Sequence, residues 1–532
     1  MVYDLILRGG TVVDGDDREP FGADVLVKDG RIVAIGSSAD AQAREVLDVR
    51  GKIVSPGFVD MHSHSDICPL VPYLPESKLF QGVTSELCGN CGISILPCSD
   101  ERRIEIERYC AGELEIPMLD TPITTYTTSQ YAQYIREHPV SGNYGMLVGH
   151  GTLRGCIMGF EDRPPTAEEL AAMETRLDRE LSEGAFGMSL GLAYPPSCYA
   201  KTDELEALAR VIERHGGMLS VHLRDECARI PDSVQEMIDI AEHTGVHVQI
   251  SHFKFMQSTN WHLFPRTMAL VDDARARGLH ITCDQYPYVA SALALSAMLP
   301  HWAHDGGLSA MMECIQHPTE ALLSEMEVKL AGRGGPDGIM ICSTRGIREE
   351  WEGLRIREVA NRLGLDPLHG VLEILKICGP EVFITTFAQS IDVVRSIFCR
   401  RDIATITDGY GLSYDPEITK DKLHPRNFST YPHAIEWARE EKLLPLRTVI
   451  YKCTGLPAHM MGLQDRGTLA VGNWADITVF DHDAIHENAT YSQPMQKPDG
   501  IEYVIVNGQV VLRDGRITDA RPGRALLFGR DQ

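Results

Sequence analysis

Short apolar runs alternate with segments of helical period over most of this chain. Each run spans roughly four to ten residues and ends in a glycine, a proline or a polar side chain. This alternation is typical of repeated βα units, in which parallel strands are joined by helices. We expect eight such strands, at residues 53–62, 84–87, 146–150, 186–190, 218–223, 247–252, 280–284 and 404–407. Eight parallel strands close a TIM barrel, so the sequence predicts an α/β fold of the (β/α)8 type.

The choice of eight strands leaves out a ninth candidate. Residues 382–387 form another short apolar run. Between the strands, Thr166 and Glu169 match a capping box, and the apolar residues that follow fall on one helical face. The crossover at residues 289–344 is longer than the rest. We interpret it as a subdomain inserted over the barrel mouth.

Both ends of the chain have a β-type texture. The pairs Asp14-Gly15 and Asp29-Gly30 separate short apolar runs near the start, and Asn507-Gly508 does so near the end. Such dipeptides favour tight hairpins. We therefore predict that residues 1–54 and 465–532 form one small β-sandwich domain. Residues 55–464 would then form the catalytic barrel.

Charge and hydropathy argue against two classes of partner. The chain has 75 Asp and Glu against 50 Lys and Arg, and no stretch of clustered basic residues offsets the net charge of -25. Such a chain repels phosphate backbones, so we expect no nucleic-acid partner. No run of ~18 apolar residues indicates a membrane span. The N-terminus lacks the basic and apolar segments of a secretory signal, which favours a cytoplasmic location, and an oligomer is compatible with these features.

Metal-ligand side chains recur at the ends of the expected strands. His62 and His64 end the first strand, and residues two apart in an extended chain point to the same side. His222, His252 and Asp408 close three later strands in the same way. The C-terminal ends of barrel strands surround the active site. Because imidazole and carboxylate groups suit Zn²⁺, we predict a zinc site there.

Two neighbouring metal ions need a bridging anion, and a carboxylated lysine on the fourth strand is one common solution. No lysine occurs between Lys78 and Lys201, so another group must bridge or only one site is tight. The Gly-Asn-Cys-Gly segment that ends at Gly92 offers Cys91, whose thiolate would be a good zinc ligand. We prefer Cys91 to Cys88, because flanking glycines let its backbone turn inward. A Cys-x-x-Cys redox motif is the alternative, but it has no thioredoxin-like surroundings.

At this point the chain resembles the amidohydrolase superfamily and, within it, the N-acyl-D-amino-acid deacylases, or D-aminoacylases. The resemblance extends over nearly the whole chain. Its motifs are Pro56-Gly57-Phe58-Val59-Asp60-Met61-His62-Ser63-His64, Gly89-Asn90-Cys91-Gly92, Gly149-His150-Gly151-Thr152-Leu153, His222-Leu223-Arg224-Asp225-Glu226, Ser251-His252-Phe253-Lys254, Tyr286-Pro287-Tyr288, Asp408-Gly409 and His424-Pro425-Arg426. The His-x-His pair marks the superfamily, and Gly-Asn-Cys-Gly narrows it to this family.

The resemblance implies a role for each matching residue. A tight zinc would be held by Cys91, His222 and His252, with His62 and His64 lining a weaker second site. Asp408 would be the catalytic aspartate. Lys254 and Tyr288 would grip the carboxylate of a small N-acyl amino acid substrate. Two positions depart from the family, Phe253 in place of a common histidine and Ser291-Ala292 in place of Gly-Ser.

The predicted reaction is the hydrolysis of the amide bond of an N-acyl-D-amino acid, with Asp408 taking a proton from the attacking water and passing it to the leaving amine. Lys254 stands two residues after His252, which also places it on the ligand side of the chain. Arg224 and His150, near strand ends, are further candidates for substrate binding. The competing readings are a cyclic amidase of the dihydropyrimidinase or hydantoinase type, which the missing lysine disfavours, and a non-catalytic assembly module.

Overall fold

The computed structural model describes residues 2–113 and 127–530. Its centre is a set of parallel strands in two hydrogen-bonded groups, β6-β7-β8 and β9-β10-β11-β12-β13-β17. These strands are β6 (Phe58–Asp60), β7 (Val83–Cys88), β8 (Asn143–Met146), β9 (Val148–Gly149), β10 (Gly187–Gly191), β11 (Met218–His222), β12 (His247–Ile250), β13 (Ile281–Gln285) and β17 (Ile403–Thr405). Leu147 alone separates β8 from β9. Every one of the eight expected runs therefore contains a strand of this set.

The first and last of these strands also approach each other. A parallel bridge joins Ser63 to Gly409, beyond the ends of β6 and β17. The backbone N–H of Asp408 donates to the carbonyl of His62 at 3.0 Å, and that of His64 donates to the carbonyl of Gly409 at 3.0 Å. The parallel strands thus follow one another from β6 to β17 and back to β6.

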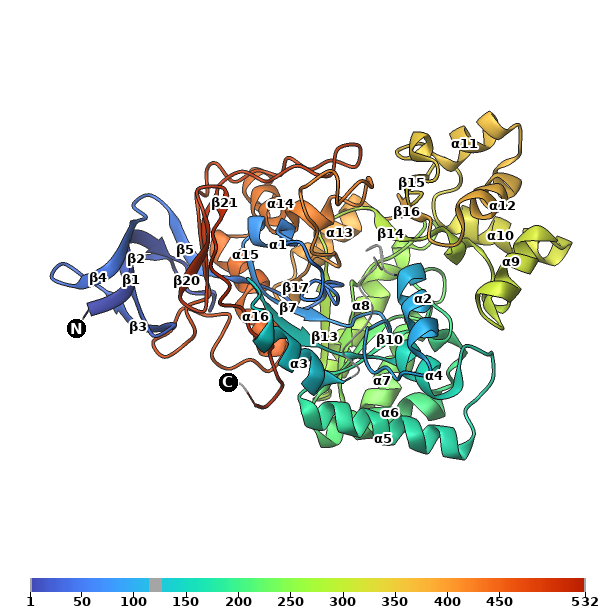
Figure 1. Cartoon of the computed structure of the whole chain (residues 1–532), viewed down its shortest axis with the longest axis horizontal. Coiled ribbons are helices and arrows are strands. Elements are labelled where there is room, and N and C mark those ends of the chain that lie inside the picture. Colours follow the sequence, from blue (N-terminus) through green and yellow to red (C-terminus); the bar gives the residue numbers. More distant parts are fainter. Residues whose placement is uncertain (1, 114–126, 531–532) are drawn as a thin grey trace.

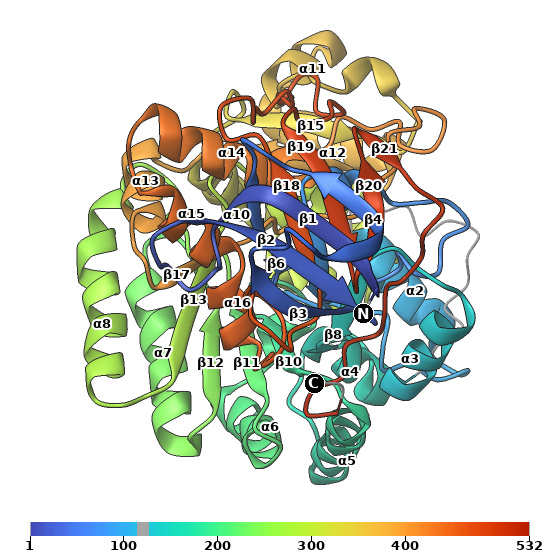
Figure 2. The same ribbon diagram turned by 90° about the vertical axis from the view of Figure 1, so that its left-hand side faces the viewer.

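Helices that precede or follow these strands along the chain pack around this set (Figure 2). They are α1 (Ser77–Phe80), α2 (Arg103–Glu113), α3 (Thr128–Glu137), α4 (His150–Met158), α5 (Ala167–Glu183), α6 (Thr202–Arg214), α7 (Ile230–Thr244), α8 (Phe264–Ala276), α13 (Ile391–Phe398), α14 (Arg426–Glu440), α15 (Leu446–Cys453) and α16 (Gly455–Met460). The expected capping box starts α5, with Thr166 and Glu169 bonded reciprocally. No described helix is long and apolar enough to cross a membrane.

The two chain ends share one sheet. It contains β1 (Val2–Val12), β2 (Phe21–Lys28), β3 (Arg31–Gly36), β4 (Gln42–Asp48), β5 (Ile53–Pro56), β18 (Ile477–Phe480), β19 (Ile501–Val506), β20 (Gln509–Arg513) and β21 (Arg516–Ile517). The first expected strand is divided, because β5 pairs with β1 and β18 whereas β6 pairs with β7. The break falls at Gly57, where a Cβ atom would lie 2.2 Å from the side chain of Thr84.

A second group of elements lies at the opposite end of the parallel strands from this sheet (Figure 1). Its antiparallel strands, in the order β14-β16-β15, are β14 (Ser291–Ala294), β15 (Ile339–Ser343) and β16 (Phe383–Thr386). They pack with α9 (Leu308–Gln316), α10 (Glu320–Gly332), α11 (Ile356–Leu363) and α12 (Pro367–Cys378) in a shared apolar core. The ninth candidate strand, 382–387, therefore belongs here. The expected end of the insertion at residue 344 was too early, because β16 pairs between β14 and β15.

Candidate metal centre

Six potential metal ligands converge at the C-terminal ends of the parallel strands. His62 and His64 follow β6, Cys91 follows β7, His222 ends β11, His252 follows β12 and Asp408 follows β17. All six are buried, with at most 5% of their surface exposed. The structure thus brings together every metal ligand that the sequence predicts, together with Asp408.

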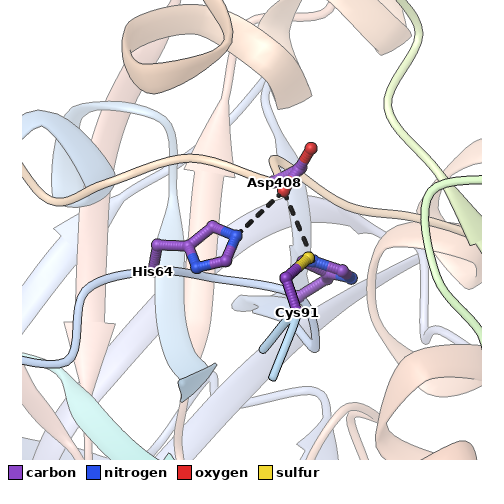
Figure 3. Close-up of side chains that lie close together, drawn as sticks. His64, Cys91 and Asp408 are labelled. Atoms are coloured by element: carbon purple, nitrogen blue, oxygen red, sulfur yellow. Dashed lines mark hydrogen bonds and ion pairs between the residues drawn. The ribbon is translucent and has the colours of Figure 1, made fainter. Parts of the chain in front are cut away.

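These residues form two groups that share Cys91. His62, His64, Cys91 and Asp408 offer ligand atoms that all lie within 4.8 Å of one another, and Cys91, His222 and His252 do the same. The Sγ atom of Cys91 is 3.4 Å from Nε2 of His62 and 3.3 Å from Nε2 of His252. Figure 3 shows Cys91 and His64 directed toward the carboxylate of Asp408. A thiolate at this position could serve both groups.

The backbone at three of the ligands is in the left-handed region, where non-glycine residues are uncommon. Cys91 has a φ of 54°, His252 of 33° and Asp408 of 50°. Each such conformation costs about 1–3 kcal/mol and persists only where the surroundings impose it. The glycines beside Cys91 are needed at this turn, because a Cβ atom on Gly89 would lie 2.2 Å from the carbonyl oxygen of Leu147. Three of the six potential ligands therefore have a strained backbone at the turn that directs their side chains inward.

The two cysteines of the Cys-x-x-Cys segment differ in their surroundings. Burial raises the pKa of the Cys88 thiol well above its ordinary value, and nearby carboxylates raise it further. Burial would also raise the pKa of Cys91, but the His252 and His62 imidazoles hold it well below its ordinary value. Cys91 is therefore the one poised as a thiolate.

Asp408 is held as an anion by its neighbours. Burial alone would raise its pKa, but the Arg426 guanidinium and the His252 ring hold it well below the ordinary value. Arg426 donates to Oδ2 at 2.6 Å, whereas Oδ1 lies 3.1 Å from Nε2 of His64 and 3.3 Å from Nε2 of His62. One oxygen is thus held by a cation, and the other faces the ligand group.

Two carboxylates, those of Asp284 and Glu226, contact three of the histidines in the ligand groups. Asp284, at the end of β13, accepts from the backbone N–H of His252 at 2.5 Å and lies 3.5 Å from Nδ1 of His62. Glu226 lies 3.6 Å from Nε2 of His222 and 3.4 Å from Nδ1 of His252. Carboxylate neighbours of this kind orient ligating imidazoles and make them better donors to a metal.

A cavity opens beside the ligand groups. It is lined by His64, Cys91, Ile93, Tyr194, His222, Glu226, His252, Lys254, Tyr286, Ser291, Ala292, Leu293, Ala294, Arg333, Phe383, Asp408, Tyr410 and Arg426. The Ser291–Ala294 segment, Arg333 and Phe383 come from the elements built around β14, β15 and β16. These elements therefore complete the wall of the cavity.

Lys254, predicted to bind the substrate carboxylate, lines the cavity. Its ammonium is 2.8 Å from Nδ1 of His252 and 2.5 Å from Oε1 of Glu226. Burial would lower the pKa of this lysine, but the Glu226 carboxylate raises it above the ordinary value. Lys254 is thus a charged, buried cation within reach of the ligand groups.

The tyrosine predicted to bind substrate lies elsewhere. Tyr288 donates to Oε1 of Glu487 at 2.6 Å and stacks on the ring of His433, and it does not line the cavity. Tyr286, two residues earlier, does line it. The residue between them, Pro287, has its carbonyl bound by His433, which places Tyr288 among the helix α14 contacts.

Arg224 and His150 also lie outside the cavity lining. The Arg224 guanidinium pairs with both oxygens of Glu236, at 3.1 and 3.0 Å, and donates to two loop carbonyls. His150 is fully buried between Oγ of Ser197, at 2.8 Å, and Oε1 of Glu204, at 3.0 Å. Both side chains have protein partners where a substrate was expected.

Sequence reasoning assigned no role to several residues that the structure places at the site. Glu226 and Arg426 are the last residues of the His222–Glu226 and His424–Arg426 motifs. Both motifs were recognised in the sequence, but neither of these two residues was given a role. Tyr194 and Tyr410 pack against the rings of His222 and His64, with centroids 4.7 and 5.4 Å apart. Glu226 could have been predicted as a site residue because it stands four residues after the ligand His222. Nothing in the local sequence indicates that the two tyrosines lie at the site.

The donor atoms fit a transition metal of the zinc type. Thiolate and imidazole ligands select Zn²⁺ over Mg²⁺ and Ca²⁺, which prefer oxygen. Nδ1 of His64 and Nδ1 of His222 are also buried without a hydrogen-bond partner among the described residues. A buried set of imidazoles and a thiolate, with partners missing, matches the chemistry of a metal centre.

Comparison with known proteins agrees with this chemistry. A model of the amidohydrolase family matches residues 415–512. A D-aminoacylase from Alcaligenes xylosoxydans xylosoxydans is 32% identical over 98% of this chain and 97% of its own. The structure of an N-acyl-D-glutamate deacylase from Bordetella bronchiseptica, with zinc and a phosphonate inhibitor, has a TM-score of 0.83 at 30% identity and covers 99% of this chain and 100% of the other.

A cyclic amidase is more distant. An L-hydantoinase from Arthrobacter aurescens has a TM-score of 0.54 at 16% identity, which shows a common fold alone. By contrast, the likeness to the D-aminoacylase extends over the full length of both chains at 32% identity. The chain therefore belongs to the D-aminoacylase family of metal-dependent amidohydrolases.

Proposed function

We propose that this protein is a zinc-dependent deacylase that hydrolyses the amide bond of N-acyl-D-amino acids to a carboxylate and a free D-amino acid. The observation that carries the proposal is the position of Cys91, shared by two groups of buried ligands in a chain related over its whole length to such deacylases. The D configuration of the substrate is supported by those relatives.

Zinc is the proposed cofactor. Cys91, His222 and His252 would hold the tight ion, and His62, His64 and Asp408 would hold a second, weaker one with Cys91 between them. When bound, zinc would supply a Lewis acid that activates water near neutral pH and polarises the scissile carbonyl. The zinc complex of the related glutamate deacylase supports this choice of metal.

Asp408 is the proposed general base and acid. Its carboxylate is held ionised by Arg426 and has one oxygen directed at the ligand groups. Asp408 therefore accepts the proton of the attacking water and then donates it to the nitrogen of the leaving amine. General acid–base transfer of this kind contributes about 10²–10⁴-fold to the rate.

Lys254 is proposed to hold the substrate carboxylate, with Tyr286 beside it in the place expected for Tyr288. Both side chains line the cavity and belong to neighbouring strand ends, β12 and β13. Ile93, Leu293 and Phe383 supply apolar wall for the acyl group or the amino-acid side chain. Arg224 and His150 are proposed to stabilise the loops and helices behind this wall.

We also propose how the chain is divided. The parallel strands β6 to β13, together with β17, form a closed (β/α)8 barrel within residues 55–464, which the bridge between Ser63 and Gly409 supports. Residues 1–54 and 465–532 form a β-sandwich around one apolar core, supported by contacts of Leu5, Val25 and Ile477 in the same cluster. The inserted subdomain spans residues 289–386, which extends the range expected from the sequence.

The test is the release of free amino acid from a panel of N-acetyl-D- and N-acetyl-L-amino acids by the zinc-loaded protein. The expected result is hydrolysis of D-substrates alone, lost in Cys91→Ala. Cys88→Ala is the matched control, because Cys88 is equally buried and outside the ligand groups. Activity on L-substrates alone would reject the proposed stereochemistry, and wild-type activity in Cys91→Ala would reject the metal site.

A further inference from the structure

The junction between β6 and β17 has little regular hydrogen bonding. The two strands are not paired as a ladder, and a single bridge from Ser63 to Gly409 is recorded between their extensions. Yet this junction carries His62 and His64 on one side and Asp408 on the other. The distances of 3.3 and 3.1 Å between these histidines and Asp408 depend on how the two extensions are aligned.

A buried lysine spans this junction. Lys78, on α1, is 2% exposed, and its ammonium donates to Oδ2 of Asp60 at 2.6 Å and to Oγ1 of Thr407 at 2.6 Å. It also lies 3.2 Å from Oγ of Ser63 and 3.1 Å from the carbonyl oxygen of Gly409. Along the chain, two of these partners, Asp60 and Ser63, lie on either side of His62. The other two, Thr407 and Gly409, lie on either side of Asp408.

Two carboxylates around Lys78, those of Asp60 and Glu86, make further contacts across the junction and beside His64. Asp60 accepts from the backbone N–H of Thr407 at 3.0 Å and from its hydroxyl at 2.5 Å. Glu86, on β7, lies 3.5 Å from the Lys78 ammonium and accepts from Ser63 and Ser65 at 2.6 Å each. The network therefore holds both neighbours of His64 in addition to the residues that flank Asp408.

We propose that Lys78 is a positioning residue that aligns the His62, His64 and Asp408 group and thereby creates the second metal site and places the catalytic carboxylate. The inference rests on the proposed function of Asp408. A buried ammonium with several fixed acceptors is well suited to this task, because a missing partner would leave buried carboxylates uncompensated.

The proposed tight zinc site, formed by Cys91, His222 and His252, serves as the reference against which the second site is compared. His222 and His252 stand on β11 and β12, whereas the side-chain contacts of Lys78 recorded in the described chain go to Asp60, Ser63, Glu86, Thr407 and Gly409. Loss of the ammonium should therefore weaken the second site much more than the first. A lysine that merely stabilised the fold would affect both sites alike.

The experiment compares Lys78→Met with Lys452→Met in the full chain. Lys452 is a matched control, because it is 1% exposed and its ammonium donates to the carbonyls of Arg400 and Ile403, at the opposite end of β17 from Asp408. Metal-free protein is titrated with zinc alone in a calorimeter. Thr407→Val, which removes one hydroxyl and keeps the side-chain shape, provides a milder variant should Lys78→Met not fold.

The expected result for Lys78→Met is a second zinc bound at least 10-fold more weakly, a first zinc bound within 3-fold of wild type, and a kcat at least 10-fold lower with KM within 3-fold. Thr407→Val should shift the second zinc in the same direction by a smaller factor. Lys452→Met should leave the ratio of the two affinities unchanged.

Several outcomes would overturn the proposal. They are unchanged second-site binding in Lys78→Met and Thr407→Val, equal loss at both sites, the same selective loss in Lys452→Met, or a wild-type protein that binds one zinc. The failure of the proposed function is separate: a wild-type protein that binds two zinc ions and hydrolyses no N-acyl amino acid would reject the deacylase, and the zinc titrations would still decide the role of Lys78.

Discussion

Arg426 donates a hydrogen bond of 2.6 Å to Oδ2 of Asp408. This contact leaves Oδ1 of the same carboxylate as the oxygen that faces His62 and His64. The carboxylate is thereby fixed in orientation and kept ionised next to the ligand groups. A general base that must take a proton from water at a defined point benefits from both effects.

Asp408→Asn should lower kcat at least 100-fold, because the amide cannot accept the proton of the attacking water. The tight zinc should remain, since Asp408 is not part of the Cys91, His222 and His252 group. Steady-state kinetics with metal analysis of the purified variant checks both statements. Near-normal turnover would show that another group is the base.

Lys254→Met should lower kcat/KM by about 10- to 100-fold, which corresponds to ~1.4–2.7 kcal/mol of lost transition-state binding. The loss should appear chiefly in KM, because the ammonium is proposed to bind the substrate carboxylate. Lys201→Met, an exposed lysine outside the cavity lining, is the control. The assignment fails if the variant binds substrate as well as the wild type while keeping its zinc.

Arg224→Gln should affect stability and spare substrate binding. The guanidinium is partly buried against Glu236 and two carbonyls, so its loss should lower the free energy of unfolding by about 1–3 kcal/mol. KM should stay within 2-fold of wild type. Urea unfolding and steady-state kinetics measure the two quantities, and a large rise in KM with unchanged stability would restore Arg224 to the substrate site.

The stability of the protein should fall on acidification in part through His247. Burial and the stacked ring of His280 lower the pKa of His247 to about 3, whereas its pKa in the unfolded chain is about 6.5. Below pH 6.5 His247 binds a proton in the unfolded chain but stays neutral in the folded chain. The free energy of unfolding therefore falls as the pH drops from 6.5 toward 3.

Removing the His247 imidazole should make the free energy of unfolding less dependent on pH. Between pH 7 and pH 5 the wild type should lose about 1–2 kcal/mol more than His247→Gln does, because each pH unit in this window is worth up to 1.36 kcal/mol for one proton. The measurement is the midpoint of urea unfolding at the two pH values. His317→Gln, at an exposed histidine, should reproduce the wild-type slope, and an identical slope for His247→Gln would contradict the assignment.

Local sequence was sufficient to locate the parallel strands and the candidate ligands that the structure brings together. Period and turn residues located a strand in each expected run, and His62, His64, Cys91, His222 and His252 were identified because they end or follow such strands. Parallel strands bring their C-terminal ends to one side, so residues distant in the chain were predictably brought together. The glycines beside Cys91 predicted its inward turn for the same local reason.

Other features depended on long-range partners. Residues 382–387 read as a possible barrel strand, and only pairing with β14 and β15 placed them in the insertion. Tyr286 and Tyr288 are two residues apart, and the contact with Glu487, almost two hundred residues later, decided that Tyr288 faces away from the cavity. Glu236 likewise drew Arg224 away from it.

The sequence by itself determined which chemical groups stand at the strand ends, because strand periodicity and turn residues act over a few neighbouring positions. Only the tertiary structure decided how these groups divide into two sets that share Cys91, and that Lys78 lies across the junction of β6 and β17. The physical reason is that hydrogen bonds and ion pairs between distant segments depend on the packed arrangement of the whole chain, which no local pattern encodes.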